Sequence, residues 1–489
     1  MRQKTALLLA AVLCISLCAG CGSSEKKEDS AGTENAGASE TVYVAYDGST
    51  TTEAEPEEVQ EERVFVIYCI GEDFKNRVQD FYPEYETVGE DSGMIGNVRV
   101  QWHVYSDAQE YREDLDERLS AQADPDTGSA IEGTDPNERI DLFVVDENYL
   151  RDYVESGWSL DVKEGAGLTE KELSDQFLYT QQMATDGNGR LKAVSWQATP
   201  GVFAYRRSIA KEVLGTDDPG AVQKELENWT KFRATAAKMG DKKYYMLSGY
   251  YDAFSAFRFS AEKHWENDGA LVIPDAMIEW RNMMADFTKK NYHNKTQIGE
   301  AEWVADQGPS GKVFGFFRAI GDIDSRMAAY SLEDADLAPQ AGNGIYGDYA
   351  VCCGPQTFVS GGAWILASPS SDNLILDKEI MENLTCNSTL LYKIAGNEDI
   401  FTNTISGMRR LAGEDRKDAF LGGQDPFDIY YQAATRLSCL PAGNYDRWMG
   451  DTFRNSLIKS FTGEMTQDEA MEYFYQRVKA RYPELKVSN

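Results

Sequence analysis

The stretch RVFVIYCIG, residues 63–71, is the first segment of the chain with the pattern of a folded core. Its apolar residues run almost without interruption and end in a glycine, which predicts a buried strand. The residues that follow place Phe74, Val78 and Phe81 at helical spacing before a proline. A helix is therefore expected directly after the strand, and this pair is the usual beginning of an α/β fold.

The same order of elements repeats further along the chain. Residues 97–106 alternate between polar and apolar like a strand, and residues 109–122 have the spacing of a helix. Residues 139–157 give a buried strand followed at once by a short helix. Consecutive strands separated by helices predict a parallel sheet.

The later part of the chain has a different pattern. The sequence DGNG at 186–189 allows positive φ and predicts the turn of a hairpin. Residues 201–215 then give a strand and a helix, and residues 311–317 and 361–368 give two more strands. Helices are expected over most of the remaining chain.

The last of these helices has a defined start. Thr466 is expected to be its N-cap, and Glu469 stands three residues later, as in a capping box. The final helix is therefore predicted to begin at this point.

The N-terminus carries an apolar run that is too short to cross a bilayer as a helix. Arg2 and Lys4 precede the run, and small residues follow it, as in an export signal. The sequence LCAGC at 17–21 resembles the bacterial lipobox, whose cysteine is diacylated and becomes the new N-terminus. We expect residues 1–20 to be a lipoprotein signal peptide and Cys21 to be the lipid anchor. The alternatives are a plain signal peptide and a core helix.

Composition limits the partners. Residues 21–62 hold few large apolar side chains, so we expect a disordered tether after the lipidated cysteine. The formal net charge of −33 disfavours binding to nucleic acid or to anionic lipid headgroups. With only three histidines and no paired CxxC units after the signal, we expect no zinc site and no other cofactor. The cysteines beyond Cys21 are odd in number and irregularly spaced, which favours free thiols.

Taken in order, these segments are similar to a known family. The lipobox, the strand and helix at 141–158, the hairpin, strand and helix at 186–215, and the strands at 311–317 and 361–368 resemble the family 1 extracellular solute-binding proteins. These are the maltose-binding-protein-like receptors of bacterial ABC importers. The resemblance implies a two-lobe, type II periplasmic-binding-protein fold of the α/β class, with an interlobe cleft and hinge crossovers. It also implies a monomer with a sugar ligand and no catalytic residues.

The resemblance gives an expected division of the chain. Lobe one would hold residues 63–148 and 318–362, and lobe two would hold residues 160–315 and 366–489. The hinge crossovers would lie near 148–161, near 316–318 and at 361–364. Glycines at the last of these suit a hinge, because a few residues must absorb the change in φ and ψ on closure.

A sugar site needs flat aromatic surfaces for the C–H faces and fixed polar groups for the hydroxyls. In an α/β sheet such groups lie at the carboxyl ends of strands. The residues that fit this description are Glu72, Asp73, Asp146, Trp196, Trp265, Trp303, Arg318 and Trp364. The structural alternative is capping for the acids and packing in the core for the tryptophans.

Arg318 departs from the resemblance, since relatives commonly place an aromatic residue there. A guanidinium in a cleft suits a carboxylate or sulfate, so an acidic sugar is one interpretation. The overall prediction is a lipid-anchored receptor on the outer face of the cell membrane. It would capture a mono- or oligosaccharide by lobe closure and deliver it to the permease subunits of an ABC importer. The alternatives are a peptide, polyamine or organic anion as ligand, or a surface glycosidase. The last is disfavoured because no nucleophile or metal motif is present.

Overall fold

The structure is a computed structural model, and it describes residues 63–487 apart from 399, 439–442 and 444. The expected signal peptide, the lipid anchor at Cys21 and the tether all lie outside the described residues. Within the described ranges, no helix is both long enough and apolar enough to cross a bilayer.

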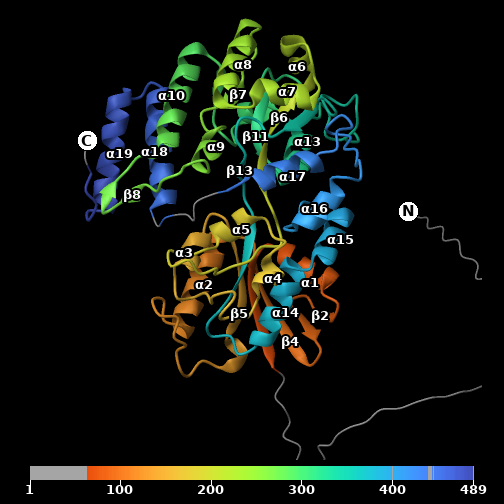
Figure 1. Cartoon of the computed structure of the whole chain (residues 1–489), viewed down its shortest axis with the longest axis vertical. Helices are drawn as coiled ribbons and strands as arrows, with labels where there is room; N and C mark the ends of the chain where they lie inside the picture. Colours follow the sequence, from red (N-terminus) through yellow and green to blue (C-terminus); the bar gives the residue numbers. More distant parts are fainter. Residues whose placement is uncertain (1–62, 399, 439–442, 444, 488–489) are drawn as a thin grey trace, which may run out of the picture. The chain divides into compact units, whose positions relative to one another are not determined.

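The first lobe is built on a six-stranded sheet (Figure 1). The predicted strands at 63–71 and 97–106 are confirmed, and they pair in parallel in the centre of the sheet. The strand predicted within 139–157 pairs in parallel on the other side of the first. In spatial order the strands are β14 (Ala363–Ala367), β5 (Ile140–Asp146), β1 (Val64–Ile70), β4 (Val98–Tyr105), β3 (Ser92–Ile95) and β2 (Tyr85–Gly89).

Helices pack against this sheet and fix the ends of its strands. The helix α2 (Ala108–Gln122) begins at Asp107, whose carboxylate accepts hydrogen bonds from the backbone N–H groups of Gln109 and Glu110. Its buried residues recur at helical spacing and face the sheet. The other helices of this lobe are α1 (Asp73–Phe81), α3 (Leu150–Val154), α4 (Glu170–Leu173), α5 (Leu178–Met183) and α14 (Leu374–Thr385), with a 3₁₀ turn at Pro136–Glu138.

The second lobe is built on a smaller, antiparallel sheet. Its central strand is β6 (Pro200–Arg206), which is buried along its whole length. It pairs with β11 (Gly315–Ala319), β12 (Tyr349–Cys352) and β13 (Phe358–Val359). The strand predicted at 201–215 is therefore confirmed, and the one predicted at 311–317 begins four residues later than expected.

This pairing corrects the expected division of the chain. Residues 316–318 lie inside β11 and do not cross between the sheets. Residues 318–362 contain β12 and β13, which belong to the second sheet, whereas β14 and α14 return to the first. Sequence order did not reveal this because the pairing partner of a short strand is set by distant parts of the chain.

In the described chain, two crossovers run directly between strands of the two sheets. Val194 still bridges to Ile365 of the first sheet, and β6 begins at Pro200, so residues 195–199 form one connection. Residues 360–362 form the other, between β13 and β14. Here Gly361 and Gly362 have φ of +82° and +109°, a conformation that favours glycine.

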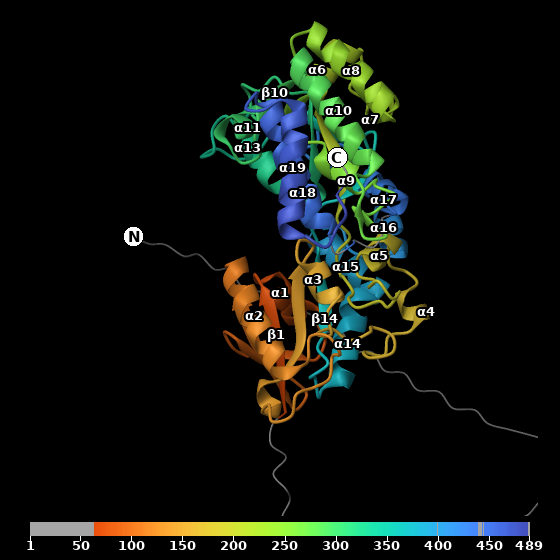
Figure 2. The same ribbon diagram turned by 90° about the vertical axis from the view of Figure 1, so that its left-hand side faces the viewer.

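Helices cover the second sheet, as Figures 1 and 2 show. Those before β11 are α6 (Arg207–Leu214), α7 (Pro219–Leu226), α8 (Trp229–Asp241), α9 (Phe254–Arg258), α10 (Asp275–Lys290) and α11 (Ala301–Asp306). After β11 come α12 (Ile320–Asp322), a π-helical turn (Ile323–Met327) and α13 (Ala328–Tyr330). Two small strand pairs complete this part: β7 (Leu247–Gly249) with β10 (His293–Thr296), and β8 (Glu266–Asn267) with β9 (Ala270–Leu271).

Among the described residues, the helices after α14 are α15 (Ser388–Glu398), α16 (Ile405–Leu411), α17 (Phe427–Arg436), α18 (Asp446–Phe461) and α19 (Gln467–Arg481). The capping box predicted at Thr466 and Glu469 is confirmed at the start of α19.

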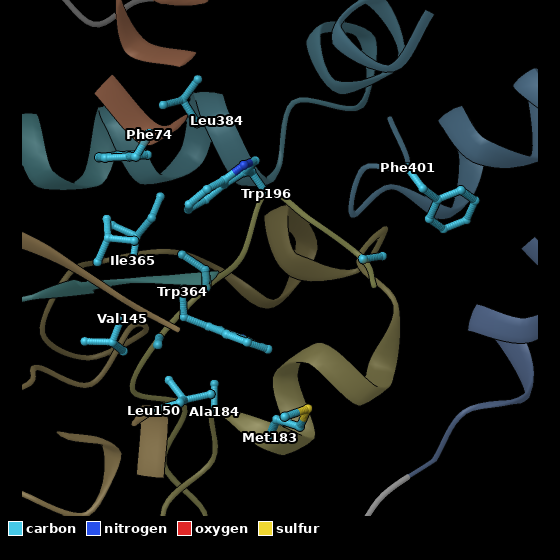
Figure 3. Packing of buried hydrophobic residues seen from close by; sticks show 14 of the residues in the cluster. Phe74, Val145, Leu150, Met183, Ala184, Trp196, Trp364, Ile365, Leu384 and Phe401 are labelled. Carbon is cyan, nitrogen blue, oxygen red and sulfur yellow. The ribbon is translucent and has the colours of Figure 1, made fainter. Parts of the chain in front are cut away.

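The described residues form two hydrophobic clusters. One fills the first lobe and continues under one face of the second sheet. The other lies on the opposite face of the second sheet, among the surrounding helices. Figure 3 shows Trp196 and Trp364 among the buried side chains of the first cluster. The predicted free thiols are confirmed for the four cysteines of the described chain: Cys69, Cys352, Cys353 and Cys386.

Candidate functional site

A cleft of about 720 Å³ lies where the two lobes meet beside the 195–199 crossover. The first lobe contributes the beginning of α1, and the second contributes the segment after β11 and the start of α17. The lining residues are Asp73, Arg77, Gln197, Ala198, Thr199, Ile320, Gly321, Asp324, Ser325, Tyr346, Glu398, Ile400, Phe401, Arg416, Lys417, Asp418, Phe420, Pro426, Phe427 and Tyr430.

Asp73 is placed in the cleft by the strand that precedes it. It is the first residue of α1, directly beyond the carboxyl end of β1. One carboxylate oxygen accepts a hydrogen bond from Arg77 at 2.9 Å, and the other accepts one from Gln197 Nε2 at 3.0 Å. Arg77 also forms an ion pair with Glu398. This network ties α1 to the crossover and to the end of α15.

The crossover also positions an aromatic residue. Gln197 forms a β-bridge with Thr402, and the backbone N–H of Ala198 donates to the carbonyl of Phe401 at 3.3 Å. The segment around Phe401 is therefore held against the crossover, and its ring borders the cleft.

Five aromatic residues line the wall on the side of the second lobe. Phe401, Phe427 and Tyr430 pack together with ring centroids 6.0–6.3 Å apart, and Phe427 and Tyr430 lie three residues apart on one face of α17. Tyr346 packs against Phe420 at 5.5 Å. Such a wall can contact the apolar faces of a ring-shaped ligand.

The hydroxyl of Tyr430 has no hydrogen-bond partner among the described residues. The side chain lines the cleft, although the residue is only 4% exposed. Burial raises the pKa of this hydroxyl well above its usual value, and the nearby carboxylates of Asp324, Asp418 and Asp425 raise it further. A buried phenol without a partner is unfavourable, so it needs an explanation.

The basic groups of the cleft are largely held by the protein itself. Arg77 is held by Asp73 and Glu398, as described above. Arg416 donates to the carbonyl of Gly396 at 3.2 Å and lies 3.8 Å from a carboxylate oxygen of Glu414. Lys417 is exposed. The same part of the lining also holds the acidic side chains of Asp324 and Asp418.

The other two predicted acids lie outside this cleft. Glu72 is exposed and forms an ion pair with Lys75 at 3.3 Å, although it makes no capping hydrogen bond to α1. Asp146 ends β5 and accepts a hydrogen bond from the backbone N–H of Asn148 at 2.8 Å. Asp73 is therefore the one predicted residue that the structure places in the cleft lining.

The four predicted tryptophans are all buried and none lines the cleft. Trp196 packs against Phe74, and Trp265 lies in the second hydrophobic cluster. The indole N–H of Trp364 donates to the carbonyl of Thr180 at 3.1 Å, and that of Trp303 donates to Asp252 at 3.2 Å. All four side chains are thus packed inside the protein, as the alternative of core packing expects.

Arg318 is also buried away from the cleft lining. Its guanidinium lies 5.0 Å from the ring centroid of Trp303 and 3.5 Å from a carboxylate oxygen of Asp322. Burial lowers its pKa, and the neighbouring carboxylates oppose that change. Arg318 is therefore not among the residues that line the cleft, and the acidic-sugar interpretation stays a prediction.

Most of the lining residues were not predicted from the sequence. Eleven of them follow residue 340. Several stand in loops, such as Asp418, whose carboxylate accepts hydrogen bonds from the backbone N–H groups of Phe420 and Leu421. The only local signal was the dense run of aromatic residues in 427–431. That run alone does not distinguish a cleft wall from a core helix.

A second set of contacts joins the lobes away from the cleft lining. Residues 147–149 follow β5, and we call them the 147–149 loop. Arg258 of α9 lies 3.6 Å from the carboxylate of Glu147, and Arg447 of α18 donates to the carbonyl of Asn148. The guanidinium of Arg447 also lies 4.6 Å from the ring centroid of Tyr149.

The part of the chain that the structure describes contains no group of three or more metal-ligating side chains that could hold a metal ion. No protein-family model matches the chain, and no curated protein sequence matches it.

Solved structures do match the fold. An extracellular solute-binding protein of family 1 superposes with a TM-score of 0.69 at 13% identity, covering 85% of this chain and 99% of that one. The sugar-binding protein MalE from Xanthomonas citri gives 0.64 at 12% identity, covering 85% and 96%. The galacto-N-biose/lacto-N-biose I-binding protein of an ABC transporter from Bifidobacterium longum, in complex with lacto-N-biose, gives 0.59 at 13% identity, covering 88% and 100%. The chain thus has the two-lobe α/β fold of these binding proteins, as predicted.

Proposed function

We propose that this protein is an extracytoplasmic solute-binding receptor that captures a mono- or oligosaccharide in the cleft between its lobes. The observation that carries the proposal is the composition of the cleft. It combines an aromatic wall with hydrogen-bonding groups on the opposite side, in a volume typical of small-molecule sites.

The arrangement suits capture by closure. The cleft lies beside a crossover, and its walls come from both lobes, so a ligand that touches both walls favours the closed form. Asp73 and Gln197 offer polar atoms from one side, and the rings of Phe401, Phe427 and Tyr430 offer apolar surface from the other. No chemical step is needed for this function, and we propose none.

We propose that the chain is anchored through diacylated Cys21 and passes its ligand to the permease of an ABC importer. We also propose that the lobe boundaries follow the two sheets. The support is the lipobox-like sequence at 17–21 and the ABC transporter role stated for the Bifidobacterium longum protein of the same fold.

A thermal-shift screen against mono- and disaccharides tests the proposal. A ligand at about one hundred times its dissociation constant stabilises the folded protein by about 2.7 kcal/mol. We expect at least one saccharide to raise the unfolding temperature by several degrees. Peptides, polyamines and organic anions should be screened in parallel, and a response to one of these with none to any sugar would reject the saccharide assignment.

A further inference from the structure

We propose that the lobes hinge on one three-stranded ribbon, which bends at Gly361 and Gly362 and which supplies part of the cleft lining. The strands of this hinge ribbon are residues 194–201, 358–365 and 401–403. The inference rests on the proposed function, because it names the place where the closing motion acts on the ligand site. It adds residues 401–403 as a third strand to the two crossovers described above.

The two crossovers keep a single register. Val194 bridges to Ile365 in the first lobe, and Pro200 pairs with Val359 at the start of the second sheet, both antiparallel. Six residues separate Val194 from Pro200, and six separate Val359 from Ile365, so the register passes from one lobe to the other without an inserted residue. The crossovers are therefore the middle of one antiparallel ladder.

Hydrogen bonds join the crossovers between these two pairs. The N–H of Ser360 donates to the carbonyl of Thr199 at 3.0 Å, and the hydroxyl of Thr199 donates to the carbonyl of Gly361 at 2.8 Å. Near the other end, the hydroxyl of Ser195 donates to the carbonyl of Ala363 at 2.6 Å. Because the bonds lie near both ends, the two segments move together and do not act as independent linkers.

Residues 401–403 form the third strand, on the other side of the first crossover. Gln197 forms its antiparallel bridge with Thr402, and the N–H of Asn403 donates to the carbonyl of Trp196 at 2.9 Å. This strand lies between α15, which packs next to α14 of the first lobe, and α16, which packs next to α17 on the central strand of the second sheet. It therefore also passes from one lobe to the other.

The two glycines are the bending point of the hinge ribbon. In the shared register Gly361 stands opposite Ala198, and Gly362 stands opposite Gln197. Both glycines have positive φ, which a residue with a Cβ rarely adopts. A Cβ at Gly362 would lie 3.1 Å from Oγ1 of Thr199, whereas one at Gly361 would meet no atom within 4 Å. Since a few residues absorb the change in φ and ψ on closure, and the neighbours are held in the ladder, the change falls on these glycines.

The hinge ribbon is also a wall of the ligand site. Four of its residues line the cleft: Gln197, Ala198, Thr199 and Phe401. The side chain of Gln197 donates to Asp73 of the first lobe at 3.0 Å. Bending of the ribbon therefore moves lining residues, and a ligand that contacts them favours one arrangement of the lobes over the others.

Gly361→Ala tests the bending point, and Gly463→Ala is its matched control. The two glycines have φ of +82° and +84°, and a Cβ at either would meet no atom within 4 Å. Gly463 lies between α18 and α19, outside the hinge ribbon. Both substitutions strain the backbone in the same way, so both should lower the urea midpoint by a similar amount.

Small-angle scattering of the ligand-free proteins should then separate the two variants. Gly361→Ala should have a larger radius of gyration than the wild type, because it disfavours the arrangement in which α9 and α18 contact the 147–149 loop. Gly463→Ala should match the wild type. An unchanged radius for Gly361→Ala, or the same increase for both variants, would overturn the proposal.

Hydrogen exchange of the ligand-free wild type tests the three strands and needs no variant to fold. The backbone amides of Ala198, Ser360 and Asn403 each donate a hydrogen bond within the hinge ribbon. We expect these amides to exchange at least about tenfold more slowly than in the unfolded chain. Exchange of Asn403 at the unfolded rate would remove the third strand, and exchange of Ala198 or Ser360 at that rate would break the ribbon; each result would overturn the proposal.

Isothermal titration calorimetry with maltose, lacto-N-biose and β-1,6-galactobiose tests the link between hinge and cleft. Gly361→Ala should bind the saccharide that the wild type binds about three- to ten-fold more weakly, because less of the protein is in the binding arrangement. Gly463→Ala should bind it like the wild type. Equal affinity of Gly361→Ala and the wild type would overturn this link. If the wild type binds no saccharide here or in the wider screen, the proposed function fails, whereas scattering and hydrogen exchange still decide whether the hinge ribbon exists.

Discussion

Single buried carboxylates set part of the stability of this protein. Asp377 is fully buried in α14, and neither of its carboxylate oxygens has a hydrogen-bond partner among the described residues. Burial raises its pKa well above the usual value, and the nearby carboxylate of Asp141 raises it further. Burial likewise raises the pKa of Asp141 to about 6.

These raised pKa values make the free energy of unfolding depend on pH. In the unfolded chain these acids lose their protons near pH 4, whereas in the folded protein they hold them to higher pH. The folded state then binds more protons, so the contribution of these groups to the free energy of unfolding falls as the pH rises from about 4. For Asp141 the fall is complete above about pH 6.

We therefore expect Asp377→Asn to be more stable than the wild type at pH 7, by about 1–3 kcal/mol. The gain should shrink as the pH is lowered to 4, where the unfolded chain also begins to bind this proton. Urea unfolding at pH 4, 5.5 and 7 measures it. Asp372→Asn is the control, because Asp372 is partly exposed and its ion pair with Arg139 is worth little. A destabilised Asp377→Asn at pH 7 would show that the carboxylate is satisfied in its ionised form.

The tryptophans give a second prediction for single residues. Trp364→Phe removes buried surface and leaves the carbonyl of Thr180 without its donor. We expect a loss of about 2–3 kcal/mol in the free energy of unfolding and little change in the affinity for the sugar. Chemical unfolding and calorimetry on the same variant measure both. If affinity fell by more than tenfold while stability held, Trp364 would be a ligand contact after all.

At the scale of elements, the 147–149 loop is the connection that is most open to test. Arg258 and Arg447 reach it from two helices of the second lobe. We expect Arg447→Ala to release part of this contact, so that the lobes separate more readily. Small-angle scattering of the ligand-free variant should give a larger radius of gyration than the wild type, and sugar affinity should fall several-fold.

The control for this prediction is Arg477→Ala, because Arg477 is an exposed residue of α19. It should leave both the radius of gyration and the affinity unchanged. Identical scattering from Arg447→Ala and from the wild type would mean that the loop contact does not hold the lobes together.

Elements with a strong local signal could be predicted from the sequence. The strands β1 and β5 are buried parallel strands, so they appear as unbroken apolar runs, and Thr466 with Glu469 forms a capping box at a fixed spacing. The partner of β11 could not be predicted, because pairing with β6 joins segments more than one hundred residues apart.

The candidate site was harder to predict for a related reason. Asp73 follows directly from the end of β1, which is a local relation. The aromatic wall comes from the loop at Phe401 and from α17, and only tertiary packing brings these beside the crossover. The four predicted tryptophans are buried, whereas phenylalanine and tyrosine side chains border the cleft.

For the whole molecule, we expect a saccharide to bind in the cleft between the lobes, against the aromatic wall. The most direct measurement is a crystal structure of the full chain with the best sugar from the thermal-shift screen. The predicted result is density for the sugar between Asp73 and Gln197 on one side and Phe427 and Tyr430 on the other. Sugar density at any other place, with this cleft holding only solvent, would contradict the claim.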